Sequence, residues 1–564
     1  MNKSLISGGE LVIQELSKEG IKDIFTLVGN QVSPILVHAS QYNLNVISTR
    51  HEQGAVYMAD GWAQVKRKAG VAIVSGGPGF TNALTGIIKS FYAHTPLLVI
   101  IGNVVKSQKD NGVLQDIDQL EIVQKYTKWS KVVYSTDRIP EYIERALTIA
   151  NTGTRGPVVL EIPIDVLRNS IKYDVKVERK FAVDLLISSS DQNLAQVINI
   201  IKASKKPMVI IGDEVYYTRA EKEVFDFIKQ VNIPVYTINK ARGVIPDDGL
   251  CFGSGRVIEG GNQLYSYKEA DLVITIGVFS DYQMGQFSSK YFKNVNKIVS
   301  FNINSEVNLN SNFRSDVQVS GSLKINLEKL TKIIESNNYE FNYKSWLKEL
   351  SEHRDNFYRL LKSYSSNEEN KLKAVDVFDA IQQHMKQNTI IVIDGSNAMF
   401  WASVLLKCQF PGQLIIAPDG MYGPMGTGVG LAIGAKIANP NYDVILYTGD
   451  GSFGFDVVDL DTLRRAGLGI KIFIHNDSTW GLCKSTQLIL YKDTEATDLG
   501  LVRYDKWVNA FGGIGFLVTD IMKFKECMDK NYNNNKTVCF NLIMDEKEYS
   551  PGTIVFNEIL KGQK

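Results

Sequence analysis

Two aspartates near the C-terminal end of the chain stand where carboxylates could bind a metal ion. Asp450 lies between glycines in Thr448-Gly-Asp-Gly-Ser452, directly after the apolar run Val444–Tyr447. Asp477 closely follows a second apolar run, 470–474. If both runs are parallel strands, both carboxyl groups lie at the edge of the sheet where open α/β sheets bind ligands. Two carboxylates, a backbone carbonyl and a diphosphate would form an octahedral Mg²⁺ site. For these residues taken alone, an ordinary turn and a helix cap are the alternative.

The elements that must position these residues recur along the whole chain. Short apolar runs alternate with helical patterns in three stretches, which predicts an α/β protein with three doubly wound parallel-sheet domains. We place the domains at residues 1–175, 190–335 and 370–564, with a linker near 171–192 and an exposed helix plus linker over 335–372. A further helical stretch is expected over 457–465. The expected strands are 46–49, 71–74, 97–101, 158–160, 205–212, 233–236, 271–277, 297–300, 389–393, 443–447, 470–474 and 537–543.

Composition excludes several classes of function. The 62 Lys and Arg residues balance 61 Asp and Glu residues, so no global field would hold a nucleic acid or an anionic membrane. The most apolar stretch, 96–101, is far below the roughly 20 residues needed to span a bilayer. Five scattered cysteines without a CxxC pair argue against a disulfide scaffold or a zinc-cysteine site. We therefore expect a soluble cytoplasmic protein with small-molecule substrates.

Several motifs together resemble the thiamine-diphosphate-dependent enzymes. The Gly-Asp-Gly segment followed about 27 residues later by Asn476-Asp477 is similar to the motif that binds the cofactor and its metal in that family. Four more segments resemble the activating-glutamate helix, the glycine-rich turn, the end of the first domain of acetolactate synthases, and the stretch on which the cofactor folds. These segments are 50–63, 75–82, 156–165 and 423–432. The three domains would then be pyrimidine-binding, central and diphosphate-binding.

The resemblance implies a role for individual residues. Glu52 would exchange a proton with the pyrimidine ring of thiamine diphosphate, and Gln115 would donate a hydrogen bond to a developing oxyanion. A polar loop is the alternative for Gln115. Mg²⁺ would be held by Asp450, Asp477 and the Thr479 carbonyl, with Asn476 as a lesser candidate. Asp477 stands where most relatives place a second Asn, which leaves the metal preference open. The expected cofactor contacts are Gly395, Ser396, Asn397, Gly423, Met425, Gly451, Ser452 and Trp480.

Two reactions fit the resemblance. Acetolactate synthases decarboxylate pyruvate and join the two-carbon fragment to a second 2-oxo acid. The similar 2-hydroxyacyl-CoA lyases release formyl-CoA from a 2-hydroxyacyl-CoA, and the segments 24–29, 114–120, 476–480 and 503–513 resemble that branch. We expect an acetolactate-synthase-like enzyme acting on a 2-oxo acid, with the acyl-CoA lyase as the alternative. A non-catalytic relative is the third possibility, although both Glu52 and Asp450 are present.

The central domain is the least defined part. Acetolactate synthases usually bind FAD there through Gly-x-Arg-Phe-Asp, but segment 277–282 lacks the arginine, and 301–304 has Asn where Asp is usual. These differences argue against FAD and leave open whether the domain binds FAD, ADP or nothing. Segment 210–215 also lacks the GxGxxG turn of a nicotinamide oxidoreductase. Because the family's activating glutamate and diphosphate site come from different subunits, the resemblance implies at least a homodimer and leaves a homotetramer open.

Overall fold

The computed structural model describes residues 5–172, 187–279, 282–304, 315–363 and 372–562. These residues divide into two compact units. The first unit comprises Met1–Asp184, Ala417–Tyr442 and Phe455–Ile470. The second unit comprises Leu185–Ile416, Asp443–Gly454 and Lys471–Lys564. Two segments of the C-terminal part of the chain therefore belong to the same unit as the N-terminal residues.

The first unit is built on a six-stranded parallel sheet with the strand order β3-β2-β4-β5-β7-β6. All residues of the inner strands β4, β5 and β7 are buried, as expected for a parallel sheet with both faces covered. A short antiparallel pair joins β1 (Leu5–Ser7) to β8 (Ser170–Lys172). The sheet strands are β2 (Asp23–Thr26), β3 (Asn45–Ser48), β4 (Gly70–Val74), β5 (Leu97–Asn103), β6 (Trp129–Val132) and β7 (Pro157–Pro163).

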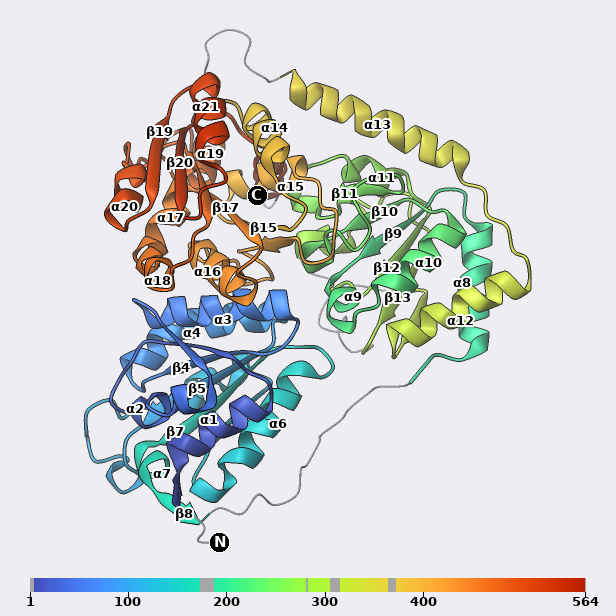
Figure 1. Cartoon of the computed structure of the whole chain (residues 1–564). Helices are drawn as coiled ribbons and strands as arrows, with labels where there is room; N and C mark the ends of the chain where they lie inside the picture. Colours follow the sequence, from blue (N-terminus) through green and yellow to red (C-terminus); the bar gives the residue numbers. More distant parts are fainter. Residues whose placement is uncertain (1–4, 173–186, 280–281, 305–314, 364–371, 563–564) are drawn as a thin grey trace. The chain divides into compact units, whose positions relative to one another are not determined.

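Helices cover both faces of this sheet (Figure 1). The helix α3 packs closely against α16 at Gly61. A Cβ atom on this residue would lie only 2.2 Å from the Leu431 carbonyl oxygen. Such an approach is open only to glycine. The helices α16 and α18, from the C-terminal part of the chain, belong to the first unit. The helices are α1 (Gly8–Lys18), α2 (Ser33–Leu36), α3 (Glu52–Lys66), α4 (Pro78–Tyr92), α5 (Gln119–Val123), α6 (Ile139–Asn151), α7 (Ile164–Arg168), α16 (Gly428–Ala438) and α18 (Leu460–Arg465).

The second unit contains two further six-stranded parallel sheets. The central sheet has the order β11-β10-β9-β12-β13-β14 and a continuous apolar core around it. Its strands are β9 (Pro207–Ile211), β10 (Val235–Thr237), β11 (Cys251–Ser254), β12 (Leu272–Ile276), β13 (Lys297–Asn302) and β14 (Val317–Ser320). Its helices are α8 (Asp191–Ala203), α9 (Asp213–Thr218), α10 (Glu221–Val231), α11 (Gln263–Glu269), α12 (Leu323–Ser336) and α13 (Lys344–Lys362).

The C-terminal sheet has the order β16-β15-β17-β18-β20-β19, so β17 and β18 are neighbours. Its strands are β15 (Thr389–Ile393), β16 (Leu414–Ile416), β17 (Asp443–Gly449), β18 (Lys471–Asn476), β19 (Ile514–Val518) and β20 (Val538–Ile543). Its helices are α14 (Ala374–His384), α15 (Asn397–Leu405), α17 (Asp450–Asp456), α19 (Gly481–Tyr491), α20 (Tyr504–Ala510), α21 (Ile521–Asn531) and α22 (Pro551–Lys561).

The predicted fold class is confirmed, since all three large sheets are parallel and flanked by helices. Each expected strand coincides with an observed one to within two residues at either end, except at the C-terminal end of β7. The observed helical structure differs from the single helix expected over 457–465. It begins at Asp450, and a 3-10 turn, Val457–Asp459, separates α17 from α18. Much of the two expected linkers lies outside the described residues.

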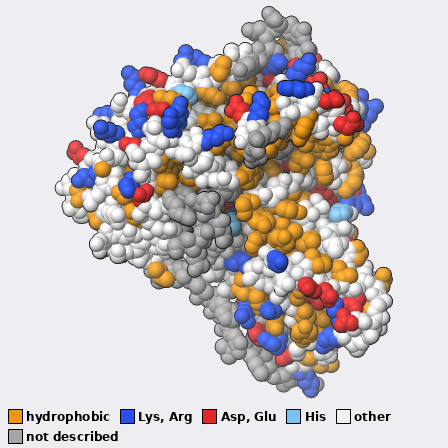
Figure 2. Space-filling view, turned by 180° about the vertical axis from the view of Figure 1, so that it is seen from behind, with side chains coloured by type: hydrophobic (Ala, Val, Ile, Leu, Met, Phe, Trp, Pro, Cys, Tyr) orange, Lys and Arg blue, Asp and Glu red, His pale blue; other side chains and the backbone are white. Residues whose placement is uncertain are grey.

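Two surface properties bear on function. Among the described residues, no helix is long and apolar enough to cross a membrane. Hydrophobic side chains nevertheless gather in patches on the face shown in Figure 2. The cytoplasmic location stays a prediction.

Candidate functional site

Glu52 is the first residue of α3 in the first unit. The ring of His51 caps this helix, since its Nδ1 atom accepts a hydrogen bond of 3.1 Å from the Gln53 N–H group. The Glu52 carboxylate is half-buried and accepts a hydrogen bond of 3.0 Å from the Asn82 side-chain amide. The other carboxylate oxygen lies beside Gly79, where a Cβ atom would be 3.4 Å away.

Two buried glutamines hold the turn that leads into α4. The Gly76 N–H group donates to Gln31 Oε1 over 2.7 Å, and the Gly77 N–H group donates to Gln119 Oε1 over 3.0 Å. The Gln119 amide in turn donates to the Glu161 carboxylate over 3.1 Å. Burial raises the pKa of Glu161, while hydrogen bonds from its neighbours lower it. This network fixes the turn that leads into α4, the helix on which Asn82 reaches Glu52.

Gln115 lies against the same turn. Its Cβ atom would be 2.8 Å from a Cβ atom on Gly77, so it fills the space that this glycine leaves open. The backbone of Gln115 has φ +69°, an unusual conformation for a non-glycine residue. The structure therefore brings Glu52 and Gln115 close to the same turn of the first unit. Sequence reasoning missed Gln119 and Asn82, although both lie in segments already singled out.

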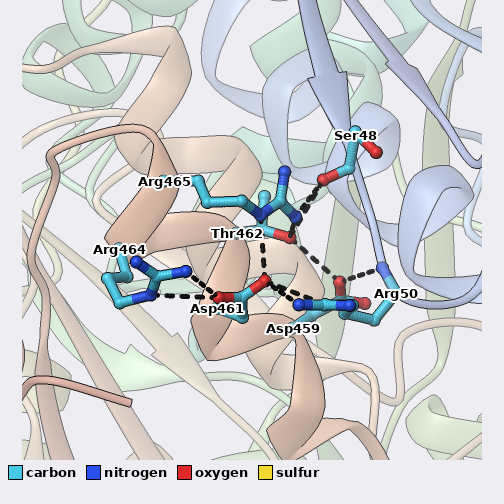
Figure 3. Close-up of polar contacts among 7 residues, drawn as sticks. All are labelled: Ser48, Arg50, Asp459, Asp461, Thr462, Arg464 and Arg465. Carbon is cyan, nitrogen blue, oxygen red and sulfur yellow. Dashed lines mark hydrogen bonds and ion pairs between the residues drawn. The ribbon is translucent and has the colours of Figure 1, made fainter.

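An ion cluster fixes the chain just before Glu52 (Figure 3). The Arg50 side chain contacts the Asp461 carboxylate at 2.6 and 2.8 Å, and the Arg50 N–H group donates to Asp459 Oδ1 over 2.7 Å. Arg464 and Arg465 also donate to Asp461. Although burial raises the pKa of Asp461, the hydrogen bonds from these three arginines hold it well below its usual range.

Gly423 and Met425 lie in the first unit, in the segment that precedes α16. Gly423 is exposed and has φ +58°, and Met425 is half-buried. The neighbouring Tyr422 ring stacks on Tyr92 at 6.4 Å between centroids, which ties this segment to the end of α4. The exposed position leaves the Gly423 carbonyl accessible to a ligand.

Asp450 and Asp477 follow adjacent parallel strands in the second unit, as the sequence predicted. Asp450 directly follows β17 and Asp477 directly follows β18, whose residues Gly449 and His475 pair in register. Asp450 is 4% exposed. Burial and the neighbouring Asp477 carboxylate raise the pKa of Asp450 to about 8. Burial also raises the pKa of Asp477 to about 6. Two buried carboxyl groups at the ends of adjacent strands suit a divalent cation.

The residues after β18 are held by local hydrogen bonds. Thr479 donates to Asp477 Oδ1 from both its N–H and its hydroxyl group over 3.0 Å. Asn476 is fully buried, and its amide donates to Asn541 Oδ1 and the Val502 carbonyl oxygen. Its oxygen accepts from Ser478. The Asn476 side chain is therefore engaged inside the protein, which leaves Asp477 as the better candidate ligand of the two.

The loop after β15 lies beside the loop after β17. A Cβ atom on Gly395 would lie 3.1 Å from the Gly449 nitrogen and 3.4 Å from Ser452 Oγ. The Asn397 side chain points elsewhere, since it donates to the Glu548 carbonyl oxygen and accepts from Ser550 and Thr553. Only the backbone of Asn397 is thus available to a ligand at this edge.

Trp480 covers the start of α17. A Cβ atom on Gly451 would lie 2.4 Å from the Trp480 ring, so only glycine fits under this ring. Ser452, next along the chain, is buried. The sequence-predicted residues Gly395, Gly451, Ser452 and Trp480 therefore lie around one end of the strand pair that carries the two aspartates.

The central sheet has a buried carboxyl group, Glu214, at the end of its strands. Glu214, just after β9, accepts a hydrogen bond of 2.9 Å from the Ile303 N–H group. Burial raises its pKa to about 7. Asn302 lies within 3.5 Å of the same oxygen, at the end of β13. Ser280 and Asp281, from the segment compared with the FAD-binding stretch, lie outside the described residues.

Comparison with known proteins places the chain in a family. Three family models match successive segments: "Thiamine pyrophosphate enzyme, N-terminal TPP binding domain" over residues 6–122, its "central domain" over 194–330 and its "C-terminal TPP binding domain" over 394–542. Thiamine pyrophosphate and thiamine diphosphate are the same molecule. The matched segments contain Glu52, the central sheet, and the pair Asp450 and Asp477.

Similar curated proteins carry two names. The chain is 27% identical to a 2-hydroxyacyl-CoA lyase 2 of Danio rerio, across 97% of this chain and 93% of the relative. It is 28% identical to an acetolactate synthase large subunit of Buchnera aphidicola, across 98% and 95%. It is 24% identical to a human 2-hydroxyacyl-CoA lyase 2, across 98% and 92%. With three family models matched in order along most of its length, the chain belongs to the thiamine pyrophosphate enzymes.

Proposed function

We propose that the chain uses thiamine diphosphate and Mg²⁺ to cleave and form the C–C bond next to a carbonyl, with a 2-oxo acid such as pyruvate as its donor. The observation that carries this proposal is the pair Asp450 and Asp477, which follow adjacent strands β17 and β18. The resemblance of five sequence motifs and the full-length match to an acetolactate synthase support the reaction class.

The metal would be held by Asp450, Asp477 and the Thr479 carbonyl. Among the described residues, no group of three His, Cys, Asp or Glu side chains could hold a metal ion by itself. The remaining ligands would therefore be backbone carbonyl and diphosphate oxygens, which suit Mg²⁺. A cation between the two aspartates would offset both the burial and the Asp477 charge that raise the pKa of Asp450.

The diphosphate would lie along the loops after β15 and β17. Gly395, Ser396, Asn397, Gly451 and Ser452 would approach it through N–H and hydroxyl groups, with Asn397 contributing only its backbone. Trp480 would close this end through its ring over Gly451. In the first unit, the Gly423 carbonyl would accept from the cofactor's amino group, and Met425 would support its bend.

Glu52 would hold the proton that the cofactor's pyrimidine ring needs. Bound thiamine diphosphate supplies an electron sink next to the carbonyl carbon. The Asn82 amide orients the Glu52 carboxylate, and Gln31 and Gln119 fix the turn that leads into α4, the helix on which Asn82 lies. Gln115, which packs against this turn, would donate a hydrogen bond to the substrate oxygen on which charge develops.

A second reaction is favoured by the relatives named 2-hydroxyacyl-CoA lyase 2, which match at least 91% of the chain. In that case the donor would be a 2-hydroxyacyl-CoA and the product formyl-CoA with a shortened aldehyde. The same residues would act on the carbonyl-forming carbon, because both reactions break a bond next to it.

The experiment supplies the purified chain, thiamine diphosphate and Mg²⁺ with either pyruvate or a 2-hydroxyacyl-CoA and measures products. We expect CO2 and acetolactate from pyruvate. Formyl-CoA and an aldehyde from the acyl-CoA, without turnover of pyruvate, would establish the second reaction instead. No product from either substrate would contradict both.

We also propose that the chain works as at least a homodimer. Large hydrophobic side chains are exposed in both units, and Figure 2 shows such side chains gathered in patches. Exposed apolar patches mark interaction surfaces. Light scattering coupled to gel filtration would give a mass of two or four chains, and a monomer that turns over substrate would contradict the proposal. The exposed large hydrophobic side chains include Met421, Tyr422, Phe455, Val458, Leu488, Tyr491, Leu501, Trp507 and Ile554.

We also propose a role for each of the three domains. The ranges 1–175, 190–335 and 370–564 would be the pyrimidine-binding, central and diphosphate-binding domains, and the three matched segments fall inside them. We propose no FAD site on the central sheet. The segment 277–279 lacks the arginine, and Glu214 places a buried carboxyl group beside Asn302.

A further inference from the structure

Gln115 lies in an exposed loop of the first unit, between the 3-10 turn Lys106–Gln108 and α5. Residues 109–118 of this loop form neither helix nor strand. Leu114, the neighbour of Gln115, is 85% exposed, so burial of this apolar side chain does not hold the loop in place. A hydrogen-bond donor stabilises a developing charge only from a fixed position. The role proposed for Gln115 therefore requires that something else fixes the loop.

The backbone of the loop has an unfavourable conformation. Asp110, Gly112 and Gln115 have φ of +66°, +69° and +69°. Two of these residues are not glycine, and residues with side chains persist in this region only where the surrounding contacts hold them there. The loop thus needs contacts that outweigh the cost of its backbone conformation.

The ammonium group of Lys109 supplies such contacts. It donates to Asp116 Oδ1 over 2.8 Å, to Asp118 Oδ1 over 3.1 Å and to the Ile117 carbonyl oxygen over 3.4 Å. The second oxygen of the Asp116 carboxylate accepts from the Asp110 N–H group over 2.6 Å. Residues at the start of the loop are thereby joined to residues at its end.

Among the contacts of Lys109, the ion pair with Asp116 is the best shielded from water. The side chain of Asp116 is 5% exposed, whereas those of Asp118 and Asp110 are 70% and 82% exposed. Ion pairs between exposed side chains add little to stability. Although burial lowers the pKa of Lys109, its hydrogen bonds with Asp116 and Asp118 raise this pKa overall, so the ammonium group is charged at neutral pH. The pair Lys109 and Asp116 is therefore the main closing contact of the loop.

The end of the loop is also fixed to the turn that leads into α4. Gln119, directly after the loop, accepts from the Gly77 N–H group over 3.0 Å and donates to Glu161 over 3.1 Å. Gln115 Cβ fills the space beside the same glycine, 2.8 Å from where a Cβ atom on Gly77 would lie. With its two ends joined by Lys109 and its last residue next to Gln119, the loop keeps Gln115 against Gly77.

We propose that Lys109 is a positioning residue, which holds Gln115 against Gly77 through its ion pair with Asp116. This proposal rests on the proposed function, in which Gln115 donates a hydrogen bond to the substrate oxygen. Without the ammonium group, three aspartates of one short loop would repel each other and the loop would open. They are Asp110, Asp116 and Asp118.

Hydrogen–deuterium exchange of the full-length chain tests whether Lys109 holds the loop. Lys109→Met keeps a long unbranched side chain but removes its charge and its donors. We expect the amides of residues 110–118 to exchange about tenfold faster in this variant, because the loop opens locally. The melting temperature should change little, since an exposed loop opens without unfolding the sheet. Lys109→Arg keeps a charged donor for Asp116 and should restore slow exchange.

Two matched substitutions locate the effect at Asp116. Asp116→Asn leaves one side-chain oxygen for two donors, the Lys109 ammonium group and the Asp110 N–H group, so it should open the loop as Lys109→Met does. Asp110→Asn makes the same chemical change at an exposed carboxylate 3.9 Å from Lys109. Asparagine adopts positive φ readily, so Asp110→Asn should exchange like the unmodified protein.

Steady-state kinetics tests whether Lys109 acts through Gln115. Lys109→Met should lower kcat about tenfold and leave KM nearly unchanged, because the hydrogen bond from Gln115 forms with charge that develops during the reaction. In a chain that already carries Gln115→Ala, Lys109→Met should lower kcat no further. Lys109→Arg should restore kcat, a rescue that a general loss of structure would not show.

Several outcomes would overturn the proposal. They are unchanged exchange of the loop in Lys109→Met, equal effects of Asp110→Asn and Asp116→Asn, and losses of kcat from Lys109→Met and Gln115→Ala that simply multiply. Full kcat in Lys109→Met beside a lowered kcat in Gln115→Ala would overturn this proposal alone. Full kcat in Gln115→Ala would overturn both this proposal and the role proposed for Gln115 in the reaction.

Discussion

Arg50 and Asp461 lie 411 residues apart in the sequence, yet their side chains form an ion pair at 2.6 Å. The backbone N–H group of Arg50 also donates to Asp459. Both contacts lie in the first unit and precede His51, the cap of α3. The segment 459–465 therefore sets where α3 begins, and with it the position of the Glu52 carboxylate (Figure 3).

The variant Asp461→Asn should destabilise the protein by about 2 kcal/mol, because it weakens charged hydrogen bonds from three arginines at once. It should also lower kcat several-fold, because Glu52 is less well fixed. The midpoint of thermal unfolding and kcat are measured together. The control Glu526→Gln removes a carboxylate from an exposed ion pair with Lys530, which is worth less than about 0.5 kcal/mol. Equal effects of the two substitutions would contradict the positioning role.

The same ion cluster shows where sequence reasoning ends. Spacing alone placed Asp450 and Asp477 correctly, because each follows a strand whose apolar residues are contiguous in the sequence. The pairing of Arg50 with Asp461 joins distant segments of the chain, and no local pattern signals it. Gln119 was overlooked for a different reason. Its burial depends on the fold, and its neighbour Gln115 in the same polar stretch looks equivalent in the sequence. The domain boundaries remain predictions.

The variant Glu52→Gln should leave the fold intact and lower kcat by about 10² to 10⁴, the usual contribution of a positioned proton-transfer group. Glutamine retains the oxygen that accepts from Asn82, so the melting temperature should change little. The variant Asn82→Ala removes only the orienting amide and should cost less. A kcat of the Glu52→Gln variant close to that of the unmodified enzyme would contradict the role assigned to Glu52.

Substitution of Gln119 should lower the stability of the protein, whereas substitution of Gln115 should lower only its activity. Gln119→Ala leaves the Gly77 N–H group and a Glu161 oxygen unpaired inside the protein, which should cost about 3 kcal/mol. Gln115 makes no hydrogen bond with the described residues, so Gln115→Ala should leave the melting temperature unchanged while lowering kcat. Thermal unfolding and steady-state kinetics are measured for both. A loss of stability in Gln115→Ala that matches Gln119→Ala would argue against a role for Gln115 in the reaction.

The variant Asp450→Asn should weaken Mg²⁺ binding at least tenfold, because it removes one of two carboxylate ligands. The affinity is measured by titrating Mg²⁺ into the protein with thiamine diphosphate and following tryptophan fluorescence, since Trp480 covers Gly451. Glu546→Gln is the matched control. Its carboxylate raises the pKa of Asp477 from outside the site, and its loss should change the affinity by less than about twofold. Similar affinities for both variants would show that Asp450 is not a ligand.

Glu214 should make the stability of the protein depend on pH. Burial raises its pKa from 4.5 to about 7, so the folded state binds a proton that the unfolded state releases between these values. Its contribution to stability is therefore full below about pH 4.5 and is lost as the pH rises through about 7, a change of roughly 3 kcal/mol. Glu214→Gln keeps the oxygen that accepts from Ile303 but does not titrate. The melting temperature of this variant relative to the unmodified protein should rise steadily from about pH 5 to about pH 8. A difference that stays constant over this range would show that the Glu214 carboxyl group is ionised in the folded protein.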